Sequence, residues 1–407
     1  MKAGYLSEYF TGVAAKRLSA VEASRFVSRQ HEFNGVESLK RMFGLATGKQ
    51  RYKARFVYLN DHDEEAVIDE GLLTWYDARE SHETRSEHRL YFPTTTVSEC
   101  ADEGDLLVIG KRPDGSVLVV VAQGGSTIAN QILWLFGLSN LTHPGFSIRE
   151  ELGTEQDRIE FAARTILEQI GVETVEPEET RLDEMLRRFD GVFPTTREFS
   201  EYTRSTLDDV SSMDDPDAAI IAWMEREEIL FRTLEKHVVA DRLTKGFSGD
   251  VDGFFSFSLS VQNRRKSRVG YALENHLEAV FTEHGVRFVR SAITEGRSKP
   301  DFLFPGSVEY HDEKFQSSLL SMLGVKSSCK DRWRQVLAEA DRIQEKHLLT
   351  LETSISENQT DEMQAKRLKL VVPKKLHETF SSKQQSWLMD LKVFLCEIIE
   401  KQVSHGE

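Results

Sequence analysis

Apolar residues in the first third of the chain gather in short runs of the length that β-strands have. Residues 55–59, 105–110 and 116–122 are rich in β-branched residues and leucine. The last two runs are separated by a segment containing Pro113, Asp114 and Gly115, which favours a hairpin turn. We therefore predict a mainly β N-terminal domain over residues 1–145.

Helical spacing replaces the strand pattern from about residue 153. Apolar residues recur three and four positions apart up to a break at Gly171, namely Ile159, Ala162, Ala163, Ile166, Leu167 and Ile170. A polar stretch at residues 173–180 is typical of a linker. The pattern predicts a largely helical connector over residues 146–242.

Helices and strands alternate in the rest of the chain. The pattern predicts helices at 267–283, 331–346 and 383–401, and strands at 287–289, 301–304, 322–326, 347–351 and 368–372. Such alternation is typical of an α/β domain. We assign this domain to residues 243–407.

Composition narrows the class of protein. The densest apolar clusters, 117–122 and 132–138, are far shorter than a membrane span, which needs about 18 apolar residues. Cys100, Cys329 and Cys396 have neither metal-ligand spacing nor an obvious disulfide partner. We expect a cytoplasmic protein with no membrane partner and no zinc site.

Charge is unevenly distributed along the 407 residues, whose formal net charge is −15. Residues 151–242 hold 24 acidic against 11 basic residues, so the remainder is nearly neutral. Two basic clusters lie outside this acidic segment, a run at 264–268 and a group of Lys326, Lys330, Arg332 and Arg334. A cationic surface for phosphates is therefore compatible with the acidic total.

One acid and one lysine are predicted at neighbouring strand ends. Asp301 follows Pro300 at the start of one strand, Lys326 ends the next, and Glu339 lies in the helix predicted after it. Carboxylates bind Mg²⁺, which activates water for phosphodiester hydrolysis, while an ammonium group offsets developing charge. This is the general pattern of the PD-(D/E)XK nuclease fold.

The second acid of that pattern normally stands two residues before the lysine, where this chain has Gly324. Glycine cannot bind a metal, so another carboxylate has to replace it. Glu339 and Glu274 both lie at the edge of an apolar helical stripe, from which they can reach a sheet edge. Periodicity alone favours the alternative that both are solvated acids.

Several longer strings resemble one family of enzymes. They are Arg264-Arg265-Lys266-Ser267-Arg268, Ile293-Thr294-Glu295-Gly296, Lys299-Pro300-Asp301-Phe302-Leu303-Phe304-Pro305, Tyr310-His311-Asp312, Val325-Lys326 and Cys329-Lys330-Asp331-Arg332-Trp333-Arg334-Gln335. Together they resemble the catalytic domain of EcoRII-type type II restriction endonucleases over about residues 258–373. In the wider group that recognises CCGG-like half-sites, the second acid has moved from the strand to the following helix, as Gly324 and Glu339 show.

The resemblance implies roles for the residues of the site. It implies that Asp301 and Glu339 bind Mg²⁺, that Lys326 assists the attacking water and that Glu274 is an additional acid. Tyr310 matches a tyrosine associated with the family's active centre. A loop aromatic that packs on the core is an equally good interpretation of Tyr310.

The same resemblance implies DNA contacts. Lys330-Asp331-Arg332 falls on the family's base-recognition triplet, in which cations donate to guanine and the acid accepts from cytosine. The alternative is a solvated helix N-terminus. Arg265 and Arg268, in the basic run, are further candidates for contacts with DNA.

The N-terminal domain resembles the family's effector domain, a DNA-binding pseudobarrel, more loosely. Lys16-Arg17-Leu18-Ser19-Ala20 and Thr84-Arg85-Ser86-Glu87-His88-Arg89 match in order, but Glu83 and His88 stand where basic residues are expected. Arg85, Glu87 and Arg89 alternate and would share one face of a strand that can enter a DNA groove. An exposed strand held by ion pairs is the competing interpretation.

The leading hypothesis is a Mg²⁺-dependent double-strand DNA endonuclease that acts as a homodimer. The resemblance implies a CCWGG- or CCNGG-like site, regulation or autoinhibition through the N-terminal domain, and a cytosine methyltransferase as genetic partner. Two alternatives remain, a catalytically inert DNA-binding regulator and a nuclease for structured or modified DNA.

Overall fold

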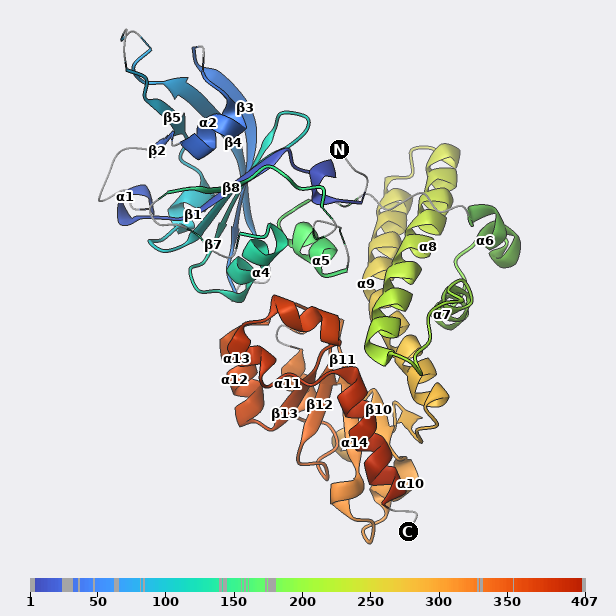
Figure 1. Cartoon of the computed structure of the whole chain (residues 1–407). Helices are drawn as coiled ribbons and strands as arrows, with labels where there is room; N and C mark the ends of the chain where they lie inside the picture. The colour runs from blue at the N-terminus through green and yellow to red at the C-terminus, as the bar shows by residue number, and fades with distance from the viewer. Residues whose placement is uncertain are drawn as a thin grey trace. The chain divides into compact units, whose positions relative to one another are not determined.

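The computed structural model describes residues 4–23, 32–35, 37–46, 48–61, 66–80, 82, 85–138, 141, 145–154, 156, 159, 161–172, 174, 181–327, 329, 332–353 and 355–404. The chain forms two compact units (Figure 1). The N-terminal unit holds Met1–Val175 with Thr353–Ser356 and Thr379–Ser381, and the C-terminal unit holds the rest. The sequence predicted three domains with boundaries at residues 145 and 242. That division stays a prediction about how the functions are distributed along the chain. No described helix is long and apolar enough to cross a membrane.

The N-terminal unit is built on an eight-stranded sheet of order β2-β5-β4-β3-β7-β6-β1-β8. Its strands are β1 (Gly12–Arg17), β2 (Glu32–Asn34), β3 (Gln50–Leu59), β4 (Val67–Asp77), β5 (His88–Tyr91), β6 (Leu106–Lys111), β7 (Val117–Ala122) and β8 (Ser147–Arg149). β6 and β7 are antiparallel, and Gly115 in the turn between them has φ +83°, as the predicted hairpin requires. The mainly β fold predicted for this region is confirmed.

Both faces of this sheet are buried, which explains why its central strands are continuous apolar runs. Leu106 and Val108 of β6 face one core, and Leu107 and Ile109 face another. The helices of this unit are α1 (Ala20–Ala23), α2 (Glu37–Phe43), α3 (Thr96–Cys100), α4 (Thr127–Leu135) and α5 (Phe161–Gln169), with a 3-10 turn η1 (Leu6–Glu8). α5 contributes Ile166 to the first core, so the start of the predicted connector is part of the N-terminal unit.

The C-terminal unit contains a five-stranded sheet of order β13-β12-β11-β10-β9. Its strands are β9 (Val289–Arg290), β10 (Phe302–Phe304), β11 (Ser321–Val325), β12 (Lys346–Leu349) and β13 (Leu368–Val371). β11, β12 and β13 are parallel, whereas β10 is antiparallel to both of its neighbours. Because Phe302 pairs with Leu323, the beginning of β10 lies beside the end of β11. The predicted α/β fold is confirmed here.

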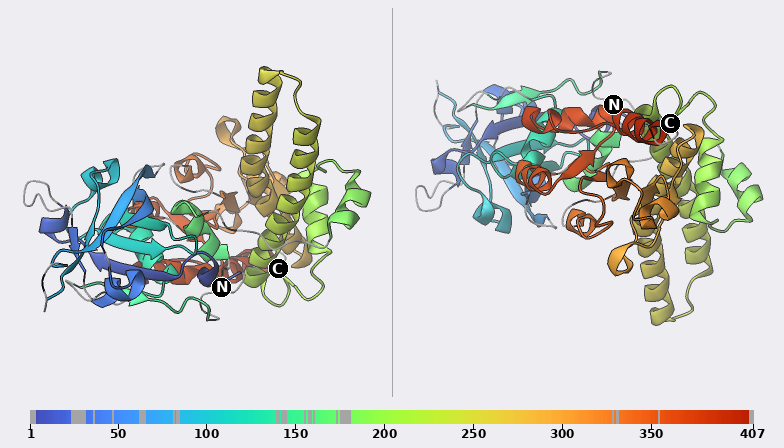
Figure 2. Two further views of the ribbon diagram at one scale, coloured as in Figure 1. Left: turned by 90° about the horizontal axis from the view of Figure 1, so that it is seen from above. Right: turned by 90° about the horizontal axis from the view of Figure 1, so that it is seen from below.

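Helices make up the rest of the C-terminal unit. They are α6 (Leu182–Phe189), α7 (Thr196–Arg204), α8 (Pro216–Lys245), α9 (Val251–Glu283), α10 (Ser307–His311), α11 (Trp333–Val336), α12 (Glu357–Ala365), α13 (Ser382–Gln385) and α14 (Leu391–Val403), with 3-10 turns η3 (Glu295–Arg297), η4 (Ser317–Leu319) and η5 (Lys374–Thr379). α8 and α9 lie side by side in both views of Figure 2 and form a long hairpin. α6, α7 and α8 share an aromatic core with Phe199 and Phe231, so this part of the predicted connector belongs to the C-terminal unit.

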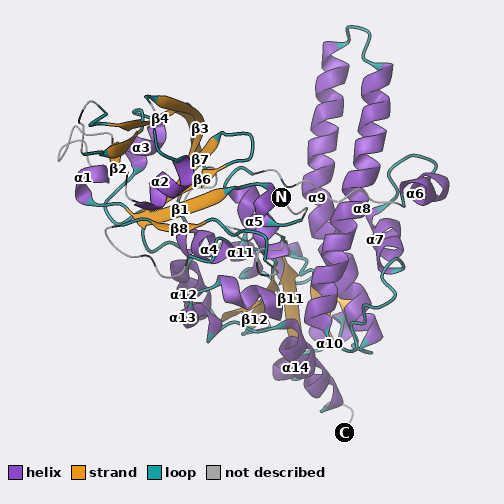
Figure 3. Ribbon diagram, turned by 45° about the horizontal axis from the view of Figure 1, so that its top comes forward, coloured by secondary structure: helices purple, strands orange, loops and turns teal. Residues whose placement is uncertain are grey.

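The outer half of the α8–α9 hairpin is weakly packed; its contacts include Arg264, whose guanidinium lies 4.4 Å from the centre of the Phe193 ring. From Lys236 to Ser267 no residue whose burial is described is buried. In Figure 3 the outer ends of both helices extend past α6 and α7. The inner half, by contrast, supplies buried residues such as Leu230 and Leu273.

The helix predicted at 331–346 is wrong in its length. α11 ends at Val336, Ala340 has φ +51°, and Lys346 already begins β12. The apolar residues Trp333, Val336 and Ile343 are buried as predicted. The segment from Val336 to Ile343, however, is a turn and not a helix. The predicted final helix is likewise two helices, because Asp390 caps a new one by accepting a hydrogen bond from Val393 N–H.

Candidate active site

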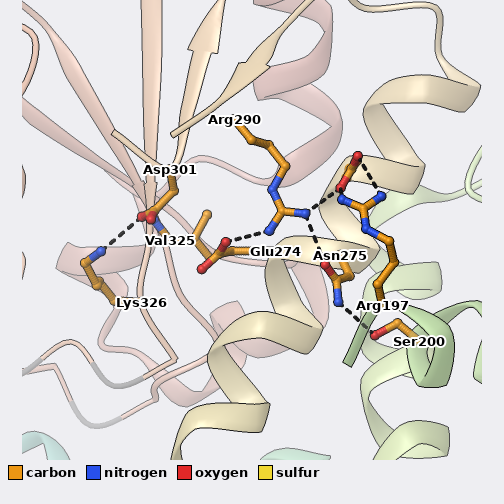
Figure 4. A network of polar contacts seen from close by, with 9 residues as sticks. Arg197, Ser200, Glu274, Asn275, Arg290, Asp301, Val325 and Lys326 are labelled. Carbon is orange, nitrogen blue, oxygen red and sulfur yellow. Dashed lines mark hydrogen bonds and ion pairs between the residues drawn. The ribbon is translucent and has the colours of Figure 1, made fainter. Parts of the chain in front are cut away.

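Asp301 and Lys326 are brought together by the antiparallel pairing of β10 and β11. Asp301 comes directly before β10 and Lys326 directly after β11. Lys326 Nζ lies 3.0 Å from Asp301 Oδ2, and Val325 N–H donates to the same oxygen at 2.6 Å. Figure 4 shows the two side chains pointing toward one another at the sheet edge. The acid and the lysine of the predicted pattern are therefore in contact.

Glu274 extends from α9 toward the same sheet edge and is paired with an arginine of β9. Its carboxylate lies 2.6 Å from the Arg290 guanidinium, which also pairs with Glu278 and donates to Asn275 at 3.0 Å (Figure 4). Burial raises the pKa of Glu274; Arg290 opposes this shift and the nearby Asp301 charge adds to it. Glu274 is thus a partly buried acid that shares the Arg290 cation with Glu278.

Glu339 stands in the turn after α11, not on a helix as predicted. Its side chain is partly buried, and Oε2 is buried without a hydrogen-bond partner among the described residues. Burial raises the pKa of Glu339 to about 7; the Lys326 charge opposes the shift and the Asp301 charge adds to it. Glu339 therefore belongs electrostatically to the Asp301–Lys326 site.

Two carboxylates of the site, Asp301 and Glu339, could bind a divalent ion, but they do not complete its coordination shell. Among the described residues, no three His, Cys, Asp or Glu side chains are grouped closely enough to bind a metal ion. Mg²⁺ commonly binds through one or two carboxylates and completes its shell with waters and substrate phosphate oxygens. The unpartnered Oε2 of Glu339, together with Asp301, fits that requirement.

Tyr310 is fully buried on α10. Its hydroxyl donates to the Glu295 carboxylate and accepts from Arg342 N–H at 3.4 Å. Burial, followed by the hydrogen bond to Glu295, raises the pKa of Tyr310. The structure thus gives Tyr310 protein partners and places it in the core, the second of the two interpretations considered from the sequence.

The residues of the C-terminal unit that were predicted to contact DNA differ in their exposure and in their ion pairs. Arg332 is exposed, whereas Lys330 and Asp331 lie outside the described residues. Arg265 lies 2.6 Å from Glu235 of α8. Arg268 is buried, pairs with Glu228 and stacks on the Phe231 ring at 4.1 Å. The buried position of Arg268 leaves it no surface for DNA in this conformation.

The predicted DNA face of the N-terminal unit is a cluster of ion pairs. β5 begins at His88, so Arg85, which is exposed, and Glu87 precede the strand rather than alternate along it. Arg89 lies 2.7 Å from Glu87 and 2.6 Å from Glu32. This geometry matches the competing interpretation, an ion-paired strand.

Sequence reasoning missed the residues that hold the site in place. Arg290, Asn275 and Glu278 lie around Glu274, and Glu295 lies beside Tyr310. One signal was present: Glu274 and Glu278 are four residues apart and therefore share a helix face that needs a cation. Nothing in the spacing identifies Arg290 as that cation.

Comparison with known proteins finds similarity in the C-terminal region. Residues 231–395 match the family described as EcoRII C terminal. The type II restriction enzyme EcoRII of Escherichia coli is 45% identical to this chain over 207 residues. Residues 231–395 are therefore similar to the EcoRII C-terminal family. The resemblance predicted from the sequence motifs is thereby confirmed, although the chain spans only 50% of the length of that relative.

Two solved structures are similar to part of the chain. Metal-depleted Ecl18kI in complex with uncleaved, modified DNA has a TM-score of 0.46 and 20% identity, and the match covers 56% of this chain and 85% of that one. The PspGI–substrate DNA complex has a TM-score of 0.44 and 17% identity, with 52% and 95% covered. Both scores are low, so these structures add nothing to the family match.

Proposed function

We propose that this protein is a Mg²⁺-dependent, site-specific endonuclease that cuts double-stranded DNA. The observation that carries the proposal is the contact between Asp301 and Lys326, with the partnerless Glu339 carboxylate beside it, inside the EcoRII C-terminal region. A buried acid with a raised pKa next to a lysine is a common feature of active sites.

In the proposed mechanism, the metal ion and the side chains have separate roles. Bound Mg²⁺ would polarise the scissile phosphate and lower the pKa of a water molecule. Asp301 and Glu339 would hold the ion. Lys326, fixed at 3.0 Å from Asp301, would orient the attacking water and offset the charge that develops on the phosphate. Glu274 would add negative charge at the site, and Arg290 keeps its side chain in place.

The finer parts of the proposal concern the target. The resemblance to EcoRII supports a CCWGG- or CCNGG-like site, recognised in part by Lys330, Asp331 and Arg332. A near-palindromic site is matched by a homodimer, which places one active site on each strand. We also propose a cytosine methyltransferase as the genetic partner that protects host DNA.

Digestion of unmethylated phage DNA with purified protein and Mg²⁺, followed by sequencing of fragment ends, tests the function. We expect discrete ends that share a CC…GG motif. Intact DNA would be expected of an autoinhibited enzyme as well as of the inert regulator. Cleavage of branched or methylated DNA alone would favour a nuclease for structured or modified substrates.

Two substitutions test the residues. Asp301→Ala and Lys326→Ala should each abolish cleavage of supercoiled plasmid, because each removes one half of the site. The matched control is another acid–lysine pair, Asp361 and Lys383, which lie 2.6 Å apart on the surface. Asp361→Ala and Lys383→Ala should cleave normally, since exposed ion pairs contribute little. Normal cleavage by either site variant would refute the assignment.

Regulation by the N-terminal unit is a further part of the proposal. Two acids of the segment 151–242, Glu228 and Glu235, pair with arginines of α9. A fragment starting at residue 243 would lose α8 and its core residues, so residues 181–407 are the better test. If the N-terminal unit inhibits, this fragment should cleave single-site DNA faster than the whole chain. Equal rates would exclude autoinhibition.

A further inference from the structure

The turn that carries Glu339 adopts a backbone conformation that its sequence does not favour. Ala340 has φ +51°, in the left-handed region that residues other than glycine rarely adopt. Such a conformation persists only when surrounding contacts hold it. The contacts around this turn therefore decide where the Glu339 carboxylate lies.

On one side, the turn is held by residues that precede β10. The Ala340 N–H donates to Thr294 Oγ1 at 3.4 Å, and the Asp341 N–H donates to Glu295 Oε2 at 3.2 Å. The Tyr310 hydroxyl donates to the same Glu295 oxygen. Glu295 thus joins a fully buried tyrosine to the backbone two residues beyond Glu339.

Further contacts hold the neighbouring residues. Lys346 Nζ donates to the Leu337 carbonyl at 2.7 Å, and Ser298 Oγ donates to the Ala338 carbonyl at 3.3 Å. Arg342, just after the turn, donates its guanidinium to the Asp312 carbonyl at 3.0 Å and to that of Tyr310. Backbone groups on both sides of Glu339 are therefore fixed, while Glu339 Oε2 itself has no described partner.

We propose that Tyr310 and Glu295 are positioning residues that hold the Glu339 carboxylate in place to bind the divalent ion. This inference rests on the proposed function, because it assigns Glu339 to the metal. Tyr310 acts through Glu295 and the Asp341 backbone and does not touch the reacting groups. Residues that orient metal ligands in this way typically change metal affinity by about 10- to 100-fold when they are replaced.

The experiment measures Mn²⁺ binding by the whole chain with electron paramagnetic resonance of free Mn²⁺, in the absence of DNA. Tyr310→Phe keeps the buried ring and removes only the hydroxyl, so we expect the Kd for Mn²⁺ to rise about 10-fold. Glu295→Leu removes the acceptor for both Tyr310 and Asp341 and should raise it further. Glu295→Gln keeps an oxygen acceptor and should restore binding close to that of the unaltered protein.

Cleavage provides a second readout that a purely structural role would not move. In Tyr310→Phe, the Mg²⁺ concentration for half-maximal cleavage should rise about 10-fold, whereas DNA affinity in Ca²⁺ should stay unchanged. The control is Tyr271→Phe, since Tyr271 lies on α9 with 54% of its surface exposed. That variant should match the unaltered protein in every measurement.

The outcomes separate this inference from the proposed function. Unaltered Mn²⁺ affinity in Tyr310→Phe and Glu295→Leu overturns the positioning role. If Tyr310→Phe keeps its Mn²⁺ affinity but no longer cleaves DNA, Tyr310 takes part in the chemical step itself. If the unaltered protein binds Mn²⁺ but cuts no DNA, the proposed function fails while the effect of Tyr310→Phe on affinity still decides the inference. If it binds no Mn²⁺ at all, both fail.

Discussion

Two clusters of charged residues, one in each unit, behave in opposite ways. At the start of β5, Arg89 lies between Glu32 and Glu87, and Arg79 lies 2.6 Å from Glu87. Hydrogen bonds from Arg89 and Arg79 lower the pKa of Glu87. Burial opposes ionisation of Glu32, but hydrogen bonds from Tyr76 and Arg89 outweigh it and lower its pKa as well. Every carboxylate of this cluster is stable as an anion.

The cluster at the ends of β10 and β11 lacks that balance. Burial raises the pKa of Glu274, and it raises that of Glu339 to about 7 although Lys326 is near. A charge-balanced cluster is complete without a ligand, whereas a buried carboxylate without enough cations gains from binding one. The difference is consistent with the proposal that the second cluster carries the chemistry.

In the comparison of the two clusters, the largest expected effect comes from removing the charge of Glu339. Glu339→Gln should lower metal-dependent cleavage by about 100-fold or more, because one of two proposed metal ligands is lost. Glu87→Gln, the equivalent change in the balanced cluster, should leave the rate unchanged. The rate of plasmid cleavage at saturating Mg²⁺ is measured for both variants. Similar losses of rate in the two variants would show that the two clusters do not differ in function.

Replacing Arg290 tests how much its positive charge stabilises the folded protein. Arg290→Met leaves Glu274 and Glu278 without their shared, half-buried cation and should lower the free energy of unfolding by about 2 kcal/mol. Urea unfolding at pH 7 measures the effect. Arg79→Met, which removes a mostly solvated arginine, is the control and should stay close to the unaltered protein. A stable Arg290→Met protein would mean that the two acids need no counter-charge.

The raised pKa of Glu339 predicts a pH-dependent cost of ionising it. Its pKa is near 4.5 when unfolded and about 7 when folded, so the folded state binds the proton more tightly and loses stability as pH rises between these values. Allowing for partial solvation, Glu339→Gln should stabilise the metal-free protein by about 1 kcal/mol at pH 8 and by nothing below pH 4. Urea midpoints at the two pH values, with EDTA present, measure this difference. Equal midpoints for variant and unaltered protein at pH 8 would contradict it.

The smallest effect is expected in the balanced cluster. In a double-mutant cycle of Arg79→Ala and Glu87→Ala, the coupling should be near the limit of detection because water solvates both charges well. The readout is the urea midpoint of the four proteins at low and high salt. A large coupling that persists in high salt would show that the N-terminal cluster is more rigid than its exposure indicates.

The adjacency of Asp301 and Lys326 was predictable from sequence because it depends only on two apolar runs becoming neighbouring strands. The true position of Glu339 was not. The apolar residues Trp333, Val336 and Ile343 fit a helix and a turn equally well, and the contacts that choose the turn come from Thr294 and Glu295, more than 40 residues earlier. Local periodicity carries no information about such partners.

The basic run of α9 shows the same limit. Its cations are visible in the sequence, and they suggested DNA contacts at Arg265 and Arg268. Their partners, Glu235 and Glu228, lie 30 and 40 residues away on α8. Only the pairing of the two helices shows that Glu228 and Glu235 of the acidic segment neutralise two cations of this run.

The unburied outer end of the α8–α9 hairpin has a consequence for engineering the protein. Its turn, residues 246–250, includes Gly246 and Gly249, both with positive φ, and no residue of described burial from Lys236 to Ser267 is buried. Exposed loop ends of this kind tolerate insertions because no buried core residue has to move. An affinity tag or a fluorescent protein inserted after Ser248 should leave both sheets intact. The hairpin end is thus a place where this protein can be labelled internally without touching either terminus.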